Sequence, residues 1–521
     1  MIRQEILSRI RSRGDPWDLV VIGGGATGMG TAVDAAARGY DVVLLEQHDF
    51  GKGTSSRSTK LVHGGVRYLQ QGNVPLVVEA LKERGLLRTN APHLVHDLPF
   101  VVPNYKWWEA PFYGIGMRVY DALAGRYGFG QSRNLSTEET LERIPNIATE
   151  GLRGGVLYHD GQFDDARLLI ALARTAHEQG AAVLNYAPVT GLMKDEEGYV
   201  IGVEARDAES GKTFSVNGRV VINATGVFAD TVRRMDDPQV QPMVRPSQGV
   251  HIVLDRSFLA GDAAIMVPHT DDGRVLFAIP WLDRVLVGTT DTPMDVPALE
   301  PLPLEEEVEF LLGHARRYMD RDPSREDVLS VFAGLRPLVA PDDTKDTAEI
   351  SREHQIRISD SGLVTIAGGK WTTYRKMAED VVDVASTVAG LAPRECVTRE
   401  LNIHGFHVHA EKFGVLAPYG SDAPEVEALQ REMAEGEAPV HSRLSLTRGE
   451  VVWFVRHEMA RSVEDVLARR SRALLLDARA ASQAASLTAS LLAAELVGRG
   501  PDWIDAQVET FQTLASHYVL E

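Results

Sequence analysis

The stretch "DLVVIGGGATGMGTAVDAAARGYDVVLLE" (residues 18–46) decides the fold of the first part of the chain. Its apolar start, "DLVVIGGG" (18–25), is typical of a buried strand that ends in a glycine turn. The following "ATGMGTAVDAAARG" (26–39) predicts a helix that closes at its final glycine, and "DVVLLE" (41–46) predicts the next strand. Strand, helix and strand at this spacing indicate a β-α-β unit in a parallel sheet.

Gly23, Gly25 and Gly28 stand in the spacing G-x-G-x-x-G between this strand and helix. The first glycine allows a tight turn, the second lets backbone approach a pyrophosphate, and the third lets the helix pack on the strand. Glu46 ends the second strand, where a carboxylate can accept hydrogen bonds from an adenosine ribose and disfavours a 2′-phosphate. The motif predicts a site for FAD or NAD rather than NADP; a purely structural glycine turn is the alternative.

The bulk composition is that of an ordinary globular protein with an acidic balance. The 521 residues carry a formal net charge of −19, from 54 basic and 73 acidic side chains, so a broad nucleic-acid surface is not expected. Cys396 is the single cysteine, which rules out a disulfide within the chain and a cysteine-based metal site. No H-x-x-x-H pattern occurs either, and no metal centre is expected.

Three regions are expected along the chain. Residues 1–16 predict a short amphipathic helical extension without the apolar core of a secretory signal. Alternating strand and helix patterns fill residues 17–394, and helical periodicity marks a C-terminal domain at 395–521, after a connector with proline and acidic residues around 405–440. No uncharged apolar run reaches the roughly 18 residues of a membrane span. We expect a cytoplasmic protein; peripheral attachment to the inner face of the cell membrane stays open.

Six motifs carry a resemblance to a known family. In order they are "VIGGGATG", "TSSRSTKLVHGGVRYL", "INATGVFAD", "PWLDRVLVGTTD", "FAGLRPL" and "IAGGKWTTYRKMAED". Their order resembles that of FAD-dependent glycerol-3-phosphate dehydrogenases, which belong to the D-amino-acid-oxidase-like flavoproteins. The resemblance spans about residues 17–390, and the helical C-terminal part is also similar. It implies FAD rather than NAD, and an α/β fold with a doubly wound FAD-binding domain, an interleaved mixed-sheet substrate domain and a C-terminal helical domain.

The resemblance implies further cofactor contacts beyond Gly23, Gly25, Gly28 and Glu46. Short hydroxyl side chains would lie along the flavin and its diphosphate, and two glycines would let backbone approach the isoalloxazine ring closely. The implied residues are Thr54, Ser55, Ser56, Lys60, Leu61, Gly64, Gly65, Gly226, Gly369, Lys370 and Thr372. Read without the family, the segment after residue 53 is a flexible Ser/Gly loop.

A substrate phosphate would be held by arginines, because the planar guanidinium stays charged and matches phosphate oxygens. The resemblance points to Arg67, Arg336 and Arg352, with Tyr68 adding a hydroxyl donor. Two or three such arginines would form a positive pocket inside an acidic protein and steer an anionic substrate toward it. For each of them the alternative is a salt-bridged arginine on the surface.

His251, Arg336 and Lys370 are the expected catalytic residues. A histidine can take a hydroxyl proton near neutral pH, although His251 lies in an alternating strand and could equally be a core histidine. Lys370, beside a helix start, would stabilise the negative charge that develops on the pyrimidine end of the flavin. Asp164 and Asp165 are expected to cap the helix that follows them.

The resemblance implies oxidation of sn-glycerol 3-phosphate to dihydroxyacetone phosphate, with hydride transfer to flavin N5 and electrons passed on to a quinone. Oxygen as acceptor, which would make the protein an oxidase, and an amine or amino acid as substrate are the alternatives. The aromatic stretch "YKWWEAPFYGIGMRVYDALAG" (105–125) could face a membrane or quinone, but we expect it to pack in the core. A homo-oligomer stays open.

Overall fold

The computed structural model describes residues 1–66, 69, 72–268, 270, 275–339 and 353–520. The strands are β1 (Trp17–Ile22), β2 (Val42–Leu45), β3 (Leu61–Val62), β4 (Val95–Pro103), β5 (Arg133–Leu135), β6 (Gly155–Phe163), β7 (Ala182–Leu184), β8 (Val189–Lys194), β9 (Val200–Arg206), β10 (Thr213–Asn223), β11 (Val244–Asp255), β12 (Ala264–Val267), β13 (Leu276–Trp281), β14 (Arg284–Gly288), β15 (Thr292–Pro293), β16 (Val328–Val339), β17 (His354–Ile358) and β18 (Val364–Gly368).

The longer helices are α1 (Arg3–Ser12), α2 (Ala26–Ala37), α4 (Val74–Asn90), α5 (Glu109–Ala124), α6 (Thr137–Arg143), α7 (Asp165–Glu178), α8 (Ala229–Asp236), α9 (Glu305–Tyr318), α10 (Tyr374–Val388), α11 (Ala423–Glu432), α12 (Arg448–Glu458), α13 (Ala473–Leu476), α14 (Ala478–Glu495) and α15 (Pro501–Ser516). Short turns of tighter or wider helix are η1 (Thr54–Ser56), η2 (Gly125–Tyr127), η3 (Gly226–Phe228), η4 (Arg256–Phe258), η5 (Arg325–Asp327), η6 (Trp371–Thr373), η7 (Ala410–Asp422) and η8 (Asp465–Arg470).

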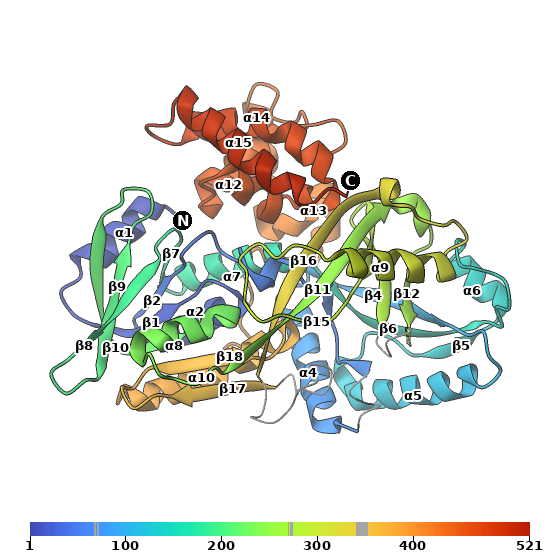
Figure 1. Ribbon diagram of the computed structural model, residues 1–521, viewed down its shortest axis with the longest axis horizontal. Helices are drawn as coiled ribbons and strands as arrows, with labels where there is room; N and C mark the ends of the chain where they lie inside the picture. Colours follow the sequence, from blue (N-terminus) through green and yellow to red (C-terminus); the bar gives the residue numbers. More distant parts are fainter. Residues whose placement is uncertain (67–68, 70–71, 269, 271–274, 340–352, 521) are drawn as a thin grey trace.

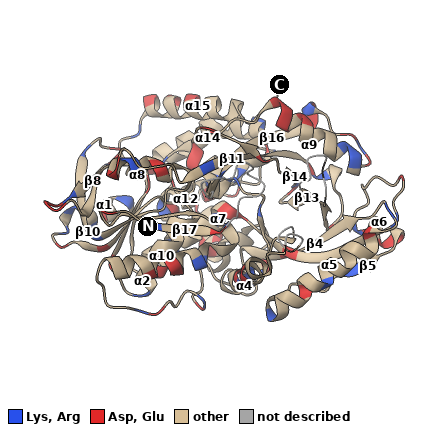
Figure 2. Cartoon of the chain, turned by 60° about the horizontal axis from the view of Figure 1, so that its bottom comes forward, with Lys and Arg blue, Asp and Glu red and all other residues tan. Residues whose placement is uncertain are grey.

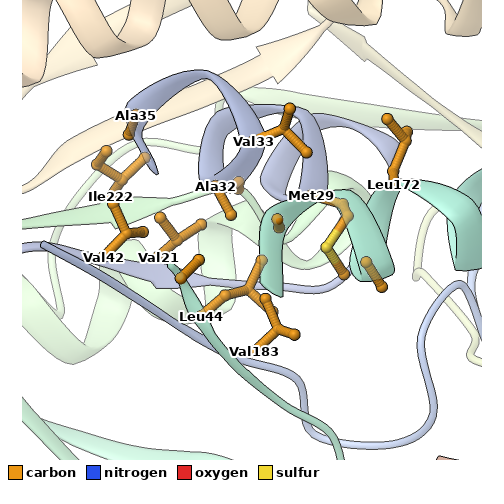
Figure 3. Close-up of a cluster of buried hydrophobic side chains, with 14 of the residues drawn as sticks. Val21, Met29, Ala32, Val33, Ala35, Val42, Leu44, Leu172, Val183 and Ile222 are labelled. Carbon is orange, nitrogen blue, oxygen red and sulfur yellow. The ribbon is translucent and has the colours of Figure 1, made fainter. Parts of the chain in front are cut away.

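The first sheet contains the β-α-β unit predicted from residues 18–46. Its strand order is β17-β18-β10-β1-β2-β7, and β1 runs parallel to both β2 and β10. Apolar residues of α2 pack on these strands, with Met29 and Ala32 of the helix above Val21 and Leu44 of the sheet (Figure 3). Gly39 follows the helix with a φ of +82°. The doubly wound FAD-binding fold is confirmed.

The second sheet is mixed and is built from segments that alternate along the chain with strands of the first. Its order is β15-β11-β14-β13-β12-β4-β6-β3, with β16 paired to β11 and β5 to β6. β4 and β12 run parallel, whereas β11 and β16 pair antiparallel over their length. The expected mixed sheet is therefore confirmed.

The C-terminal helices α12–α15 gather on one side of the molecule, above both sheets (Figure 1). Their apolar residues share one core with residues of the second sheet such as Phe332. Two reciprocal capping pairs are present in this part, Thr447 with Glu450 and Ser462 with Asp465. The stretch 405–440 is more than a connector, because η7 and α11 form within it and pack into the same core.

The expectation that residues 105–125 pack in the core is wrong for one face of α5. Phe112 is 54% exposed and Ile115 64%, and Trp107 just before the helix is 78% exposed. The opposite face is buried through Tyr113 and Tyr120. The aromatic face of an amphipathic helix can pack in the core or lie on the surface. The sequence pattern is the same in both cases, so it does not choose between them.

Candidate active site

The β1–α2 turn has the geometry that a dinucleotide cofactor requires. Gly23 adopts a φ of +107°, and a Cβ there would lie 2.7 Å from the carbonyl oxygen of Ala224. A Cβ on Gly28 would lie 1.9 Å from the carbonyl oxygen of Gly23, so the helix packs directly on its own entry turn. Glu46 accepts a hydrogen bond from the Gly24 N–H at 2.6 Å, so its carboxylate lies at the edge of this turn. These positions fit the pyrophosphate and ribose of a dinucleotide.

The hydroxyl segment Thr54–Ser56 lies on the N-terminus of α2. Ala26 N–H donates to Ser55 Oγ at 2.9 Å, so this hydroxyl stands at the helix end that would face the diphosphate. Thr54 Oγ1 donates to the carbonyl oxygen of Leu335 at 2.6 Å, and Trp371 Nε1 donates to that of Ser55 at 2.8 Å. These contacts join the segment to β16 and η6, and they agree with its predicted place along the cofactor.

Lys60 and Gly64 are implied flavin contacts, but at both positions the side-chain direction points to other protein groups. Lys60 is fully buried with a φ of +62°, and its ammonium donates to Asp165 Oδ2 at 2.6 Å, so the side chain points into the protein. A Cβ on Gly64 would lie 2.6 Å from the hydroxyl of Tyr120, to which the Gly64 N–H donates. The close approach that requires glycine at position 64 is therefore to Tyr120, and only backbone of these two residues remains for a flavin contact.

A cavity of about 590 Å³ lies between the two sheets and is lined by many of the predicted cofactor contacts, by His251 and by one predicted substrate ligand, Arg336. The predicted residues on its wall are Thr54, Leu61, Gly65, His251, Arg336, Gly369, Lys370 and Thr372. Its wall also contains Arg57, Thr59 and Thr289, which sequence reasoning did not assign to the site. The motifs around residues 60, 250, 335 and 370 therefore form a single site, as the resemblance implies.

His251 stands on β11 at the wall of this cavity and is 2% exposed. Its Nε2 lies 3.0 Å from Thr59 Oγ1, and its ring stacks on Phe332 with centroids 5.0 Å apart. Its Nδ1 is buried and has no hydrogen-bond partner in the described part of the chain. Burial, Lys60 and Arg336 together lower the pKa of His251 well below its usual value. The neutral imidazole is therefore the resting form at neutral pH, which is the form a base needs.

Arg336 reaches the cavity from β16, the strand paired with β11. Its guanidinium donates to the carbonyl oxygen of Thr290 at 2.9 Å and to Thr289 Oγ1 at 3.1 Å, and it lies 3.4 Å from Asp291 Oδ1. These contacts fix the orientation of the guanidinium. A fixed, charged fork at the wall of the cavity suits an anionic group.

The turn after β18 brings Gly369, Lys370 and Thr372 to the opposite part of the wall. Gly369 has a φ of +79°, and a Cβ there would lie 2.3 Å from Met377 Sδ. Thr372 Oγ1 accepts a hydrogen bond from the His63 N–H at 3.2 Å, so η6 is tied to the segment that follows β3. Gly226 lies in η3 with a φ of +59° and open space around its Cβ position. All four remain predicted cofactor contacts.

Three predicted substrate residues, Arg67, Tyr68 and Arg352, lie outside the described residues. Arg57 is a cation that the sequence reasoning missed; it lines the cavity, and its guanidinium donates to Glu300 Oε2 at 2.6 Å. Thr59 was missed as well, although both residues lie inside the motif that carries the family resemblance. Thr59 contacts a histidine 192 positions further along the chain. No local sequence pattern distinguishes this threonine from the other hydroxyl residues beside it.

Asp164 caps α7 as predicted, accepting from the Arg167 N–H at 3.1 Å. Asp165 is more than a cap. Its carboxylate lies at the centre of a buried cluster with Lys60, Ser58 and Arg472. Arg472 comes from the C-terminal domain, and its contact with residues beside the site has no signal in the sequence.

In the part of the chain that the structure describes, no group of three His, Cys, Asp or Glu side chains is placed to hold a metal ion. No helix within those same residues is both long and apolar enough to cross a bilayer.

Comparisons with known proteins assign the family. The sequence model of the FAD dependent oxidoreductases matches residues 18–375, and that of the C-terminal domain of alpha-glycerophosphate oxidase matches residues 364–499. A mitochondrial glycerol-3-phosphate dehydrogenase of Arabidopsis thaliana is 42% identical over 92% of this chain and 83% of that protein. The mitochondrial glycerol-3-phosphate dehydrogenase of Mus musculus is 41% identical over 96% of this chain and 73% of its own length.

Among solved structures, the glycerol-3-phosphate dehydrogenase from Bacillus halodurans, complexed with FAD, superposes with a TM-score of 0.79 at 30% identity. The match covers 99% of this chain and 98% of that one, so it includes both sheets and the C-terminal helices. An L-proline dehydrogenase from P. horikoshii shares the fold at 16% identity and a TM-score of 0.53 over 73% of this chain. The expected cofactor, fold and family are confirmed together: this chain belongs to the FAD-dependent oxidoreductases.

Proposed function

We propose that this protein oxidises the C2 hydroxyl of sn-glycerol 3-phosphate to dihydroxyacetone phosphate. The observation that carries the proposal is the shared cavity, in which a neutral histidine, His251, and an oriented arginine, Arg336, stand on neighbouring strands. An alcohol that carries a phosphate needs both a base and a cation within a few ångströms of each other. The names of the relatives at about 40% identity point to the same substrate.

Arg336 and His251 have different roles in the proposed reaction. Arg336 binds the phosphate, and the backbone and side-chain contacts to Thr289 and Thr290 hold its guanidinium in one orientation. His251 accepts the proton of the C2 hydroxyl as the carbonyl forms. Bound FAD supplies the two-electron acceptor for the C2 hydrogen. Arg67, Tyr68 and Arg352 stay predicted phosphate ligands, and Lys370 stays a predicted cation at the flavin end of the cavity.

The test is anaerobic reduction of the purified, FAD-loaded protein by glycerol 3-phosphate. We expect rapid bleaching of the flavin absorbance by this substrate and none by glycerol or by an amino acid. A flavin that dithionite bleaches but glycerol 3-phosphate does not would contradict the proposed substrate.

The Arg336→Ala variant separates phosphate binding from the rest of the site. Hydrogen bonds to a charged group contribute about 1.5–3 kcal/mol, so we expect KM for glycerol 3-phosphate to rise roughly 10- to 150-fold. FAD content should not change. Arg431→Ala, on the exposed face of α11, is the matched control and should keep the original KM. An unchanged KM in Arg336→Ala would remove Arg336 from the site.

For the electron acceptor we propose a quinone that reaches the site from a bilayer surface on which α5 lies. The exposed face of α5 is apolar, through Phe112, Ile115 and Val119. In Figure 1 the helix runs along the edge of the molecule away from the C-terminal helices, next to α4. Apolar and aromatic side chains flanked by basic ones suit the boundary between lipid headgroups and acyl chains.

The charged residues near α5 support this occupant. Lys106 precedes the helix and holds its ammonium 5.9 Å from the Trp108 ring centroid, while Arg118 is exposed on the helix itself. Figure 2 shows acidic and basic residues interspersed elsewhere, without one broad basic face. Lys106 and Arg118 would attract an anionic leaflet locally, although Glu109 and Asp121 of α5 and the acidic balance of the whole chain oppose this attraction.

The first turn of α4 connects this surface to the cavity. Val74 and Val78 are about 40% exposed beside α5, while Asn73 and Leu76 of the same turn line the cavity wall. A quinone headgroup moving past this turn would pass from the apolar surface toward the active site. The same arrangement supports a peripheral location on the inner face of the cell membrane.

Co-sedimentation with phosphatidylglycerol-containing vesicles tests the surface. We expect the unmodified protein to bind and the Phe112→Ser/Ile115→Ser variant to lose binding, with anaerobic bleaching unchanged. Val415→Ser replaces an apolar residue of η7 that is 87% exposed, more than Phe112 or Ile115, and should bind like the unmodified protein. After substrate bleaching, reoxidation by a quinone analogue faster than by air supports the dehydrogenase, and the reverse order identifies an oxidase.

A further inference from the structure

A buried ion cluster lies directly behind the His251 ring and takes no part in the cavity wall. Lys60 Nζ donates to Asp165 Oδ2 at 2.6 Å, and Arg472 Nη2 donates to Asp165 Oδ1 at 2.9 Å. All three side chains are at most 1% exposed. Arg472 Nε also lies 3.6 Å from Asp164 Oδ1, so the cluster holds two cations and two carboxylates, and Lys60 is its buried cation whose charge no solvent screens.

Lys60 is the member of the cluster next to the histidine. Its ammonium lies 5.3 Å from the Phe332 ring centroid, and the His251 ring stacks on Phe332 at 5.0 Å with an interplanar angle of 15°. The ammonium and the imidazole are therefore within roughly 10 Å of each other. No hydrogen bond joins the two side chains in the described part of the chain, so Lys60 acts on the histidine through its charge.

The other charged groups around His251 do not offset this charge. β14 presents Gly288 opposite the histidine, and β16 presents Phe332 and, further along, Arg336. The segment before β3 presents Thr59, which is neutral. On the cavity wall stand the cations Arg57 and Lys370 and the carboxylates Asp160 and Asp291; Asp160 pairs with Arg84 at 2.6 Å, and Asp291 interacts with Arg336.

We propose that Lys60 is a positioning residue for the reaction: its ammonium, held by Asp165 behind the Phe332 ring, keeps the His251 imidazole uncharged and able to accept the substrate proton. The proposal rests on the proposed function, because it assumes that His251 is the base. Asp165 Oδ2 holds the ammonium in place, while Arg472 donates to the other oxygen of that carboxylate.

The direction of the titrations agrees with the geometry. Burial first, then Lys60 and Arg336, lower the pKa of His251 well below its usual range. Burial lowers the pKa of Lys60 to about 7, although Asp165 acts in the opposite direction. At the acidic pH where His251 would take up a proton, Lys60 is therefore charged, and its repulsion of an imidazolium is present when it matters.

The experiment measures the rate of anaerobic flavin reduction at limiting glycerol 3-phosphate as a function of pH, in the holoenzyme and in Lys60→Met. The quantity compared is the acid limb, which is the part of the profile where the rate falls as the pH decreases. A unit charge about 10 Å away at an effective dielectric constant of about 20 shifts a pKa by roughly one unit. We expect the limb to move up by about one pH unit in Lys60→Met and to return to its original pH in Lys60→Arg.

Arg472→Met is the matched control. It removes the other cation from the same carboxylate, but its guanidinium faces Trp281, at 5.6 Å, and not Phe332. The acid limb should stay at its original pH even if the variant is less stable. Equal shifts in Lys60→Met and Arg472→Met, or no shift in Lys60→Met, would overturn the proposal.

A second measurement does not depend on turnover. With imidazole-labelled histidine, the His251 resonance, assigned through its loss in His251→Asn, reports protonation directly by NMR. We expect its pKa to be higher in Lys60→Met, and an identical titration would overturn the proposal. Should Lys60→Met fail to fold, Lys60→Gln removes the same charge, keeps a hydrogen-bond donor for Asp165 and takes its place in both measurements. Failure of unmodified protein to bleach would count against the proposed function, whereas the NMR shift decides the role of Lys60 separately.

Discussion

At the scale of single residues, the hydrogen bond between Thr59 and His251 decides which ring nitrogen can accept a proton. Nε2 lies 3.0 Å from Thr59 Oγ1, while Nδ1 is buried and has no partner among the described residues. When the Nε2–H donates to the threonine, Nδ1 carries the free lone pair of the neutral ring, and the imidazole is held in one orientation. Thr59 is thus expected to fix the tautomer in which the histidine is a base.

Thr59→Val keeps the shape of the side chain and removes its hydroxyl. A neutral hydrogen bond contributes about 1 kcal/mol, so we expect kcat to fall roughly fivefold or more while KM changes little, because the phosphate cations are untouched. Steady-state kinetics with a quinone analogue measure both quantities. Thr59→Ser retains the hydroxyl and should behave like the unmodified protein. Equal kcat in the valine and serine variants would exclude this role.

At the scale of elements, helix α2 depends on the absence of a side chain at Gly28. A methyl group there would meet the carbonyl oxygen of Gly23, which belongs to the turn that approaches the cofactor. That oxygen is part of the backbone, so the collision can be relieved only if the helix moves off β1 or the turn opens. The packing of one helix on its own first turn therefore controls the shape of the dinucleotide site.

Gly28→Ala should lower the FAD content of the purified protein and destabilise it by about 1–3 kcal/mol, as overpacking of a close contact does. Absorbance of the flavin relative to protein gives the content, and a urea titration gives the stability. Gly116→Ala in α5 adds the same methyl where no atom lies within 4 Å, and we expect it to be neutral or slightly stabilising. Normal FAD content in Gly28→Ala would show that the turn tolerates the change.

The wide helical turn η8 performs a comparable task for the loop after β2. Arg469 Nε donates to Asp49 Oδ2 at 2.6 Å, and Arg470 Nη2 donates to Asp49 Oδ1 at 2.9 Å. A few residues on, Lys52 donates to Glu464 at 2.6 Å. These bonds hold the start of the loop that continues into the hydroxyl segment Thr54–Ser56, so the C-terminal domain orders one wall of the cofactor site.

At the scale of the whole molecule, buried ion pairs connect the C-terminal domain to the first sheet. The contact between the two is therefore sensitive to acid. Burial alone would raise the pKa of Asp49, but Arg470 and Arg469 hold it at about 2. Glu464, held by Arg469 and Lys52, also has a pKa of about 2. A carboxylate with a lowered pKa stabilises the fold above its ordinary pKa, and this stability is lost as the pH falls toward the folded value.

We expect the urea midpoint to decrease as the pH falls from about 4.5 to 2, with Asp49 contributing about 2 kcal/mol of that loss. Asp49→Asn should destabilise the protein at pH 7 by about 3–5 kcal/mol, because two buried arginines lose their shared partner. Its deficit relative to the unmodified protein should shrink below pH 4. Parallel pH profiles for the two proteins would mean that Asp49 does not carry the acid sensitivity.

The sequence by itself determined the features that depend on neighbouring residues. The β-α-β unit, the three-glycine turn and the capping pair Thr447–Glu450 follow from local periodicity and from side chains that bond within one turn of backbone. The motif order also identified FAD and the family. Such patterns are readable because their partners lie within a few positions of each other.

Only the tertiary structure decided which distant residues meet. Lys60 was expected beside the flavin, yet its ammonium turns to Asp165, 105 positions away, and Arg472 of the last domain closes the cluster. The outward face of α5 was likewise decided by what the rest of the fold leaves uncovered. Long side chains and amphipathic helices have several equally good partners in isolation, and only the packing of the whole chain selects one.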